Sequence, residues 1–364
     1  MKNRNGLRPV WQIILIDLFL ALLILGGWWF SKKAGIEIAA RRFEKTLSST
    51  TPSVMETTPP LPVTSQEPAA QLPVQSVEIP PVTDVLEPEI PDLRTELQKK
   101  FEDHFTDTIV LTENSYSSPN ISITLSSGTL GEGNDQSVYY VADIYLGSID
   151  CFQSYFAHGL AYPSRTALMP QMMEETGALL AINGDYCGLN FGGIILRNGV
   201  SISSAANGSD ICILFADGSL QCMNSREYHA EDYEEGSIRH IWCFGPAMMD
   251  GSGNVLPESE MNLPSYIAGY NPRTGIGYYE PGHYCFVVAD GRNPGYSKGI
   301  YMSEFAGIFA SLGCVQAFNL DGGGSTSMMF GPDFVNRPST SGQRDMPDII
   351  LIKEIDALPA DSHS

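Results

Sequence analysis

The chain has 364 residues, of which 43% are hydrophobic, enough for one large folded domain or two of ordinary size. Its formal net charge of −21 argues against nucleic acid as a partner, because phosphate backbones are bound through Lys and Arg. The seven cysteines are scattered without a CxxC pair, so the sequence also lacks the spacing of a zinc finger.

The first predicted element is an apolar run over residues 11–30, in which Asp17 is the only charged side chain. A helix of this length spans the hydrocarbon core of a bilayer. No small-x-small cleavage site follows the run, so an uncleaved anchor is favoured over the alternative, a signal peptide. We therefore expect a single-pass protein of the cell membrane, with residues 1–10 cytoplasmic and the folded domain extracellular, although basic residues also follow the run.

A linker is predicted over residues 31–91. Its first part continues as a short helix, whereas residues 48–91 contain ten prolines, many Ser and Thr, and few aromatic side chains. Such a composition cannot bury enough apolar surface to offset the entropy of ordering the segment. We expect a disordered tether there, followed by one folded domain over 92–356 and a flexible tail over 357–364.

The folded domain is predicted to contain both helices and strands. Periodicity and turn signals predict helices at 92–104, 166–175 and 301–312, strands at 121–125, 138–146, 179–182, 241–248, 315–320 and 349–352, and hairpins at 194–200, 211–223 and 274–289. Helices that alternate with short apolar strands are typical of an α/β domain. We therefore expect a mixed sheet with helices packed on it.

The cysteines allow two interpretations. Most of them are expected to be small buried hydrophobic side chains. Cys212 and Cys222, however, flank the Asp217-Gly218 turn and face each other across a hairpin if the register allows. The odd total excludes complete disulfide pairing within the chain.

The most informative pattern is an internal echo. Ala181-Ile182-Asn183-Gly184-Asp185 recurs as Ala317-Phe318-Asn319-Leu320-Asp321, and a Val-Ala-Asp triplet precedes each copy, ending at Asp143 in the first case and at Asp290 in the second. Carboxylates at the ends of matched apolar strands can converge on one cleft. The pattern predicts a single domain of two related halves with a shared polar site, although Asn183-Gly184 alone also reads as a hairpin turn.

A glycine-rich loop follows the second copy. Asp321 ends a predicted strand, and the three glycines at 322–324 allow positive φ angles or close approach of the backbone to a ligand. Successive free N–H groups in such a loop form an anion-binding nest, to which Ser325 and Thr326 add hydroxyl donors. The loop suits a phosphate or a sugar ring, with Asp321 as acid, base or nucleophile; a tight turn is the alternative.

Arg273 is a notable cation in this acidic chain. It lies at a strand entry, within Asn271-Pro272-Arg273-Thr274, where a guanidinium can form a bidentate pair with a phosphate or a carboxylate. A structural Arg–Asp pair is the alternative interpretation. Arg344 is a second candidate of the same kind. The histidines lack metal-ligand spacing.

In this order, the motifs resemble the phosphodiester glycosidase family. The resemblance covers about residues 116–352 and rests on both Val-Ala-Asp triplets, both Asn-x-Asp segments, the Asn-Pro-Arg-Thr run, the Gly-Gly-Gly-Ser-Thr loop and Asn336-Arg337-Pro338. Gly275 stands where the family pattern has Ala. The resemblance implies hydrolysis of a sugar-1-phosphodiester such as an N-acetylglucosamine-1-phosphodiester, and the anchor and stalk suggest envelope glycans or exopolysaccharide as substrate.

The family chemistry needs groups that stabilise an oxocarbenium-like sugar and a departing phosphate anion. Three carboxylates are the predicted catalytic groups, with the last as an alternative to the leading pair: Asp321, Asp290 and Asp185. The predicted substrate-binding residues offer amide, hydroxyl, guanidinium and backbone N–H groups: Asn183, Arg273, Thr274, Asn319, Gly322, Gly323, Gly324, Ser325, Thr326 and Arg344.

Two other functions remain open on the sequence. The same cleft is also suited to a module that binds envelope glycopolymer without cutting it. Several carboxylates without histidine can hold Ca²⁺ or Mg²⁺, which would fit a metal-dependent phosphodiesterase. The sequence commits to no cofactor, and the expected partners are a phosphorylated carbohydrate and, through residues 11–30, the membrane.

Overall fold

A computed structural model describes residues 94–159, 165–187, 193–339 and 344–355. The predicted membrane helix at 11–30, the linker before residue 92 and the tail at 357–364 lie outside these ranges. Within the described ranges, the helices are too short or too polar to cross a lipid bilayer.

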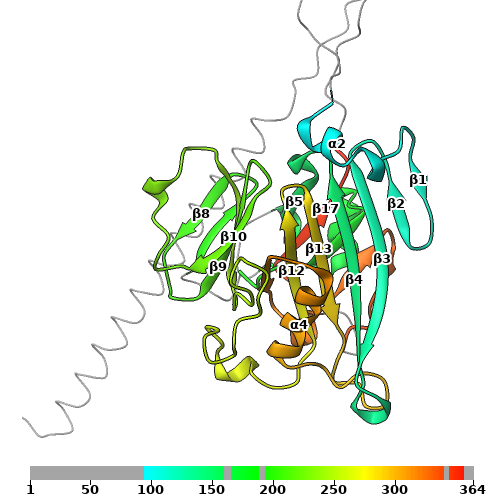
Figure 1. Ribbon diagram of the computed structural model, residues 1–364, viewed down its shortest axis with the longest axis vertical. Helices are drawn as coiled ribbons and strands as arrows, with labels where there is room; N and C mark the ends of the chain where they lie inside the picture. The colour runs from blue at the N-terminus through cyan, green and yellow to red at the C-terminus, as the bar shows by residue number, and fades with distance from the viewer. Residues whose placement is uncertain (1–93, 160–164, 188–192, 340–343, 356–364) are drawn as a thin grey trace, which may run out of the picture.

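Three sheets make up most of the described domain (Figure 1). The first has the order β1 (Val110–Leu111), β2 (Ser115–Ser117), β3 (Ile121–Leu130), β4 (Ser137–Leu146), β13 (His283–Ala289), β12 (Arg273–Glu280) and β14 (Gln316–Asn319). The second has the order β10 (Leu220–Asn224), β9 (Asp210–Phe215), β11 (Ile238–Phe244), β7 (Ile194–Arg197) and β8 (Val200–Ser204). The third has the order β16 (Asp333–Phe334), β15 (Met328–Phe330), β6 (Leu180–Asn183), β17 (Asp348–Ile352) and β5 (Phe152–Phe156).

The helices are few and short. The α-helices in the described ranges are α2 (Glu96–Lys100), α3 (Met169–Thr176) and α4 (Met302–Leu312). Single turns of 3₁₀-helix are η1 (Glu102–His104), η2 (Gly133–Asp135), η3 (Ile149–Cys151), η4 (Ala157–Gly159), η5 (Ala230–Asp232), η6 (Ser265–Ile267) and η7 (Gly323–Ser325). The helices α3 and α4 end at Gly177 and Gly313, which adopt left-handed φ angles of 66° and 90°. The predicted helix positions are therefore confirmed, and a left-handed glycine stops each of these two helices.

The α/β fold class is wrong, because the domain is mostly β-sheet. Each strand pair in the three sheets is antiparallel. Antiparallel neighbours need only short hairpins, such as the one at Pro281-Gly282 between β12 and β13, whereas parallel neighbours need long crossovers. The predicted strands and hairpins are present, but they pair with one another rather than alternate with helices.

The internal echo does not repeat as two like halves. Its Val-Ala-Asp strands, β4 and β13, are antiparallel neighbours in the first sheet, whereas its Asn-x-Asp strands, β6 and β14, belong to different sheets. Asp143 pairs in register with Cys285 within the sheet and hydrogen-bonds His283 at 2.8 Å, while Asp290 follows the far end of β13. The two triplets thus place their carboxylates at different positions along the paired strands.

The core joins all three sheets. Phe152 on β5 lies 5.7 Å from the ring of Trp242 on β11 and 5.6 Å from that of Phe286 on β13, so one aromatic side chain from each sheet meets at the centre. Helix α4 packs its Phe305 and Phe309 in a second buried cluster with residues of the first sheet (Figure 1). Because the main cluster is shared by the three sheets, they form one folded unit.

Six of the seven cysteines are buried, as predicted, and all seven are free thiols. Cys212 lies directly opposite Cys222 in the β9–β10 register, so the expected facing of this pair is confirmed.

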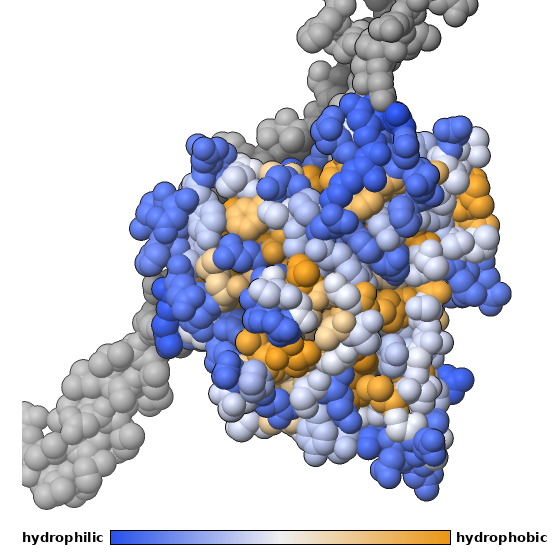
Figure 2. All heavy atoms as spheres, viewed as in Figure 1, coloured by the Kyte–Doolittle hydropathy of each residue, from blue (hydrophilic) through white to orange (hydrophobic). Residues whose placement is uncertain are grey.

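At the outer edge of the first sheet, Leu111 on β1 is 67% exposed, and apolar residues are visible at that edge in the upper right of Figure 2.

Candidate functional site

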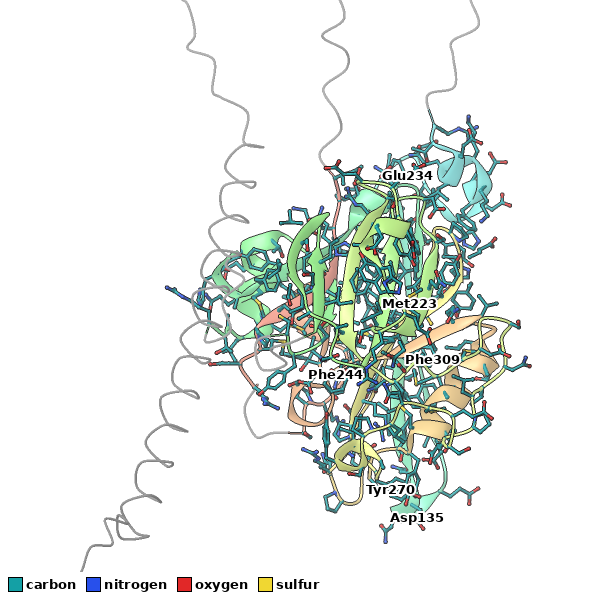
Figure 3. All side chains as sticks on the ribbon, turned by 90° about the vertical axis from the view of Figure 1, so that its left-hand side faces the viewer. Asp135, Met223, Glu234, Phe244, Tyr270 and Phe309 are labelled. Atoms are coloured by element: carbon teal, nitrogen blue, oxygen red, sulfur yellow. The ribbon has the colours of Figure 1, made fainter. Side chains whose placement is uncertain are left out.

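A pocket of about 340 Å³ opens where the end of β14, the glycine loop and the entry to β12 meet. Its walls come from six separate stretches of chain, including Phe244 at the end of β11, whose position Figure 3 labels. The lining includes seven of the predicted site residues, together with further aromatic, apolar and basic residues: Tyr186, Phe244, Tyr266, Ile267, Asn271, Pro272, Arg273, Arg292, Asn319, Leu320, Asp321, Gly322, Gly323, Gly324 and Arg344.

Asn183 joins the strands that carry the echo. Its Nδ2 donates to the carbonyl of Asp321 at 2.8 Å, and its Oδ1 accepts from the Thr274 hydroxyl at 2.7 Å and from the Ser327 amide at 3.2 Å. The side chain therefore ties β6, β12 and the glycine loop together. Asn183 and Thr274 were predicted to bind substrate, but their polar atoms are directed to the protein and hold the pocket wall in place.

The glycine loop does not form a nest of successive free N–H groups. The amide of Gly323 donates to the Pro272 carbonyl at 2.9 Å, and the amides of Ser325 and Thr326 close the turn η7 onto Gly322 and Gly323. A Cβ at Gly322 would lie 2.6 Å from the Pro272 carbonyl oxygen. Glycine is required there because the loop packs against the entry to β12, so the predicted anion nest is corrected to a tight turn that borders the pocket.

Several polar atoms at this wall lack a hydrogen-bond partner. They are buried and make no hydrogen bond of standard geometry within the described ranges, although the Ser325 hydroxyl is close enough to Asp321 to lower its pKa: Asp321 Oδ2, Asn319 Oδ1, Ser325 Oγ and Thr326 Oγ1. Burying a polar group without a partner costs free energy, so a cluster of such atoms beside a pocket marks a place where a ligand or water completes the bonding. The other amide atom of Asn319, Nδ2, donates to the Gly245 carbonyl at 2.8 Å and fixes the orientation of Oδ1.

Asp321 is the carboxylate that lines the pocket. Burial raises its pKa to about 6, while the Ser325 hydroxyl, the guanidinium of Arg344 and the Gly322 amide oppose the shift, and the charge of Asp185 adds a smaller increase. The carboxyl group is thus poised to change protonation state near neutral pH, which is the property that a general acid or base requires.

Arg273 is a buried cation with no carboxylate at ion-pair distance among the described residues, although the more distant charges of Glu258 and Glu304 act on it. Its Nε donates to the carbonyl of Ile300, and its Nη2 donates to those of Ile267 and Gly269, each at 2.9 Å. The side chain is only 2% exposed, and burial lowers its pKa to about 10, so it stays charged at neutral pH. A buried positive charge that lines a pocket favours an anionic ligand.

Two further arginines line the same pocket. Arg292 donates to the Asn271 side chain at 2.8 Å, and Arg344 donates to the Tyr186 hydroxyl at 2.7 Å with its guanidinium 4.9 Å from that ring. Arg292 was missed on the sequence, although it directly follows the second Val-Ala-Asp-Gly segment. With three arginines and one aspartate, the pocket is basic within a chain whose net charge is −21.

Asp290 lies outside the pocket lining and is 1% exposed. Its carboxylate accepts hydrogen bonds from the Tyr296 hydroxyl at 2.9 Å, from Asn336 Nδ2 at 2.8 Å and from the Arg337 amide at 3.0 Å. Asn336 in turn donates to the Thr326 carbonyl at 3.3 Å. Burial raises the pKa of Asp290, but these donors satisfy both oxygens, so the carboxylate supports the end of the glycine loop rather than facing a ligand.

Asp185 is also enclosed. Its two oxygens accept from Arg197 Nη2 and from the Cys243 amide, each at 2.7 Å, and the same Nη2 also donates to Asp348 at 3.2 Å. All three charged side chains are fully buried. Asp185 is close enough for its charge to raise the pKa of Asp321, but it does not line the pocket. The structural Arg–Asp pair considered for Arg273 is thus formed by Arg197 instead.

One trio of the described residues has the ligand spacing of a metal site: Asp185, Cys187 and Asp348, whose ligand atoms lie within 4.8 Å of one another. The guanidinium of Arg197 is already bound to both carboxylates. Burial raises the pKa of the Cys187 thiol well above its usual value, so the thiol is held in its neutral form. These features fit a neutralised ion cluster better than a cation site, which needs uncompensated negative charge.

We expect Arg197→Met to destabilise the fold by about 3–5 kcal/mol, because it leaves two buried carboxylates without their counter-charge. Burial and its Asp185 neighbour already raise the pKa of Asp348 to about 7, and removal of the arginine raises it further. The loss of stability should therefore be larger at pH 8 than at pH 5, where the carboxyls take up protons. Urea unfolding at both pH values measures it.

Arg239→Met is the matched control, because Arg239 forms an ion pair with Asp150 that is partly exposed to solvent. Its expected cost is below about 1 kcal/mol at either pH. Equal losses in the two variants would show that the Arg197 cluster contributes no more than a surface pair.

Comparison with known proteins extends this description. Residues 176–353 match the family model described as phosphodiester glycosidase. The SPbeta prophage-derived uncharacterized protein YomE of Bacillus subtilis (strain 168) is 26% identical over 212 residues, which are 56% of this chain and 32% of that protein. The chain thus spans about a third of the length of this curated relative.

Among solved structures, the chain is similar to the catalytic domain of zebrafish N-acetylglucosamine-1-phosphodiester alpha-N-acetylglucosaminidase, auto-inhibited by its pro-peptide. The TM-score is 0.54 at 14% identity, over 65% of this chain and 85% of that one, which shows a shared fold. The segment that matches the family model holds Arg273, Arg292, Asp321 and Arg344 of the pocket. Residues 176–353 are therefore similar to the phosphodiester glycosidase family.

Proposed function

We propose that the protein hydrolyses the glycosidic bond of a sugar-1-phosphodiester. The observation that carries the proposal is Arg273, a buried cation without a carboxylate partner in the described chain, in a pocket that also contains the perturbed carboxyl of Asp321. A phosphodiester supplies the negative charge for the arginine, and its sugar supplies the carbon at which a carboxylate-assisted reaction occurs. The match of residues 176–353 to the family model supports the same reaction class.

In the proposed reaction, the bond between sugar C1 and the bridging phosphate oxygen breaks, and the phosphate leaves with the electron pair. Arg273, with Arg292 and Arg344 at the pocket walls, balances the charge that grows on the leaving oxygen. A water molecule adds to the oxocarbenium-like C1, and Asp321 accepts its proton. The products are a free sugar and a phosphate monoester.

Asp321 is preferred over Asp290 and Asp185 for contact with the substrate. It lines the pocket with an unpartnered buried oxygen, whereas the oxygens of the other two are occupied by protein donors. A glycosidase usually needs a second carboxyl group to protonate the leaving oxygen. A phosphate already leaves readily as an anion, so one carboxylate with an arginine cluster suffices for this chemistry.

The substrate's origin is part of the proposal. An anchor over residues 11–30 and an extracellular domain would bring the pocket to envelope glycans or exopolysaccharide. A metal-dependent phosphodiesterase is the alternative from the sequence, although Arg197 already neutralises the trio with ligand spacing, Asp185, Cys187 and Asp348. It cuts the P–O bond instead of the C1–O bond, so the two reactions place the oxygen of water on different products.

A product assay in ¹⁸O-labelled water tests the proposal. The full chain is incubated with a panel of sugar-1-phosphodiesters, with and without EDTA. We expect ¹⁸O in the free sugar, an unlabelled phosphate monoester and turnover that survives the chelator. Label in the phosphate and loss of turnover with EDTA would establish the phosphodiesterase, and binding without any product would establish a glycan-binding module.

A further inference from the structure

Three exposed tyrosines lie next to the pocket and have no part in the proposed reaction. Tyr266 lines the pocket and is 75% exposed, and Tyr270 and Tyr301 are 40% and 38% exposed. Of the large apolar side chains in the described chain, Tyr266 is the most exposed. Aromatic rings gain stability when covered, so an exposed group of them at a pocket rim indicates a surface that a ligand covers.

The backbone that carries these rings is held by the pocket itself. Tyr266 lies in the turn η6, and Arg273 Nη2 donates to the carbonyls of Ile267 and Gly269, which follow it. The same guanidinium lines the pocket, so the charged site and the tyrosine segment share one anchor. Such anchoring lowers the entropy cost when a ligand covers the ring.

The other two rings extend this surface away from the pocket. The ring centroids of Tyr270 and Tyr301 lie 4.0 Å apart. Each tyrosine is the chain neighbour of one partner in the β-bridge between Asn271 and Ile300, and Asn271 lines the pocket. The ammonium of Lys298 lies 4.2 Å from the Tyr270 ring. In Figure 3, Tyr270 lies below Phe244, at the end of the molecule that carries Asp135. The surface thus runs from the charged pocket towards that end.

We propose that Tyr266, Tyr270 and Tyr301 form a second, sugar-binding subsite, the tyrosine ledge, which stacks against a neutral pyranose ring beyond the scissile phosphodiester. The apolar C–H face of a pyranose packs on an aromatic ring while its hydroxyl groups stay hydrated. The substrate is then an oligosaccharide or polymer whose chain continues out of the pocket, rather than a single sugar phosphodiester. This inference rests on the proposed function for the reaction that is catalysed. The expected length of the substrate's sugar chain rests on the tyrosine ledge.

The first test measures binding alone. The full chain is titrated by calorimetry with neutral tetrasaccharides of glucose, galactose, mannose and N-acetylglucosamine. We expect at least one to bind, Tyr266→Ala to weaken its Kd about tenfold, and Tyr266→Trp to retain the affinity. Leu168→Ala is the matched control, because Leu168 is exposed at 40% but does not line the pocket, and it should leave Kd unchanged.

The second test measures turnover. A methyl phosphodiester of a single sugar is compared with the same phosphodiester extended by a tetrasaccharide. Tyr266→Ala should raise KM for the extended substrate about tenfold more than for the methyl compound. Equal changes in the two KM values, or no binding by any tetrasaccharide, would overturn the ledge. If neither compound is hydrolysed but a tetrasaccharide binds through Tyr266, the reaction fails while the subsite stands.

Discussion

Asp321→Asn is expected to lower kcat/KM for a sugar-1-phosphodiester by about 10²–10⁴-fold, which is the usual contribution of a general base. In the wild type, the base must be ionised, and burial raises the pKa of this carboxyl to about 6. The rate should therefore rise with pH, reach half of its maximum near pH 6 and level off about one pH unit higher. A variant with near-normal turnover would remove Asp321 from the reaction.

The same substitution should stabilise the protein at pH 8. The folded-state pKa of about 6 lies above the unfolded value of about 3.9, so folding favours the protonated carboxyl. The contribution of this carboxyl group to stability is thus fully present below pH 4. It is lost as the pH rises through 6, where the buried group must ionise. Asn carries no charge, so we expect a gain of about 2 kcal/mol at pH 8 and almost none at pH 4. Urea unfolding at both pH values measures the difference.

Arg273→Lys is expected to fail as a conservative change. The guanidinium binds three backbone carbonyls at once, of Ile300, Ile267 and Gly269, and a single ammonium cannot reach all three from the same position. We expect kcat/KM to fall about 10²–10³-fold, because the phosphate loses a positioned cation. The unsatisfied carbonyls should also cost about 3 kcal/mol of unfolding free energy.

Arg344→Lys is the matched comparison for this prediction. Arg344 lines the same pocket, but its hydrogen bond to the Tyr186 hydroxyl is exposed to solvent. Its replacement should raise KM while the unfolding free energy changes by less than about 0.5 kcal/mol. If Arg273→Lys retained full activity and stability, the buried cation would have no special role at the pocket.

Much of the local structure follows from the sequence alone. Gly177 and Gly313 stop their helices, and Pro281-Gly282 turns the β12–β13 hairpin, because these signals depend on the conformational preferences of a few neighbouring residues. Two residues of the pocket could also be identified from the sequence. Arg273 is a cation in an acidic chain, and Asp321 ends a predicted strand directly before three glycines.

The order of strands and the partner of each charged side chain were decided only by the tertiary structure. Arg197 lies in a strand that reads as an ordinary hairpin, yet it neutralises Asp185 and Asp348, the latter 151 positions away. Asp290 repeats the sequence context of Asp143, yet Asn336 and Tyr296 satisfy it. The physical reason is that local patterns determine whether a strand or turn forms, whereas long-range packing determines which carboxylate faces a pocket and which is buried against a donor.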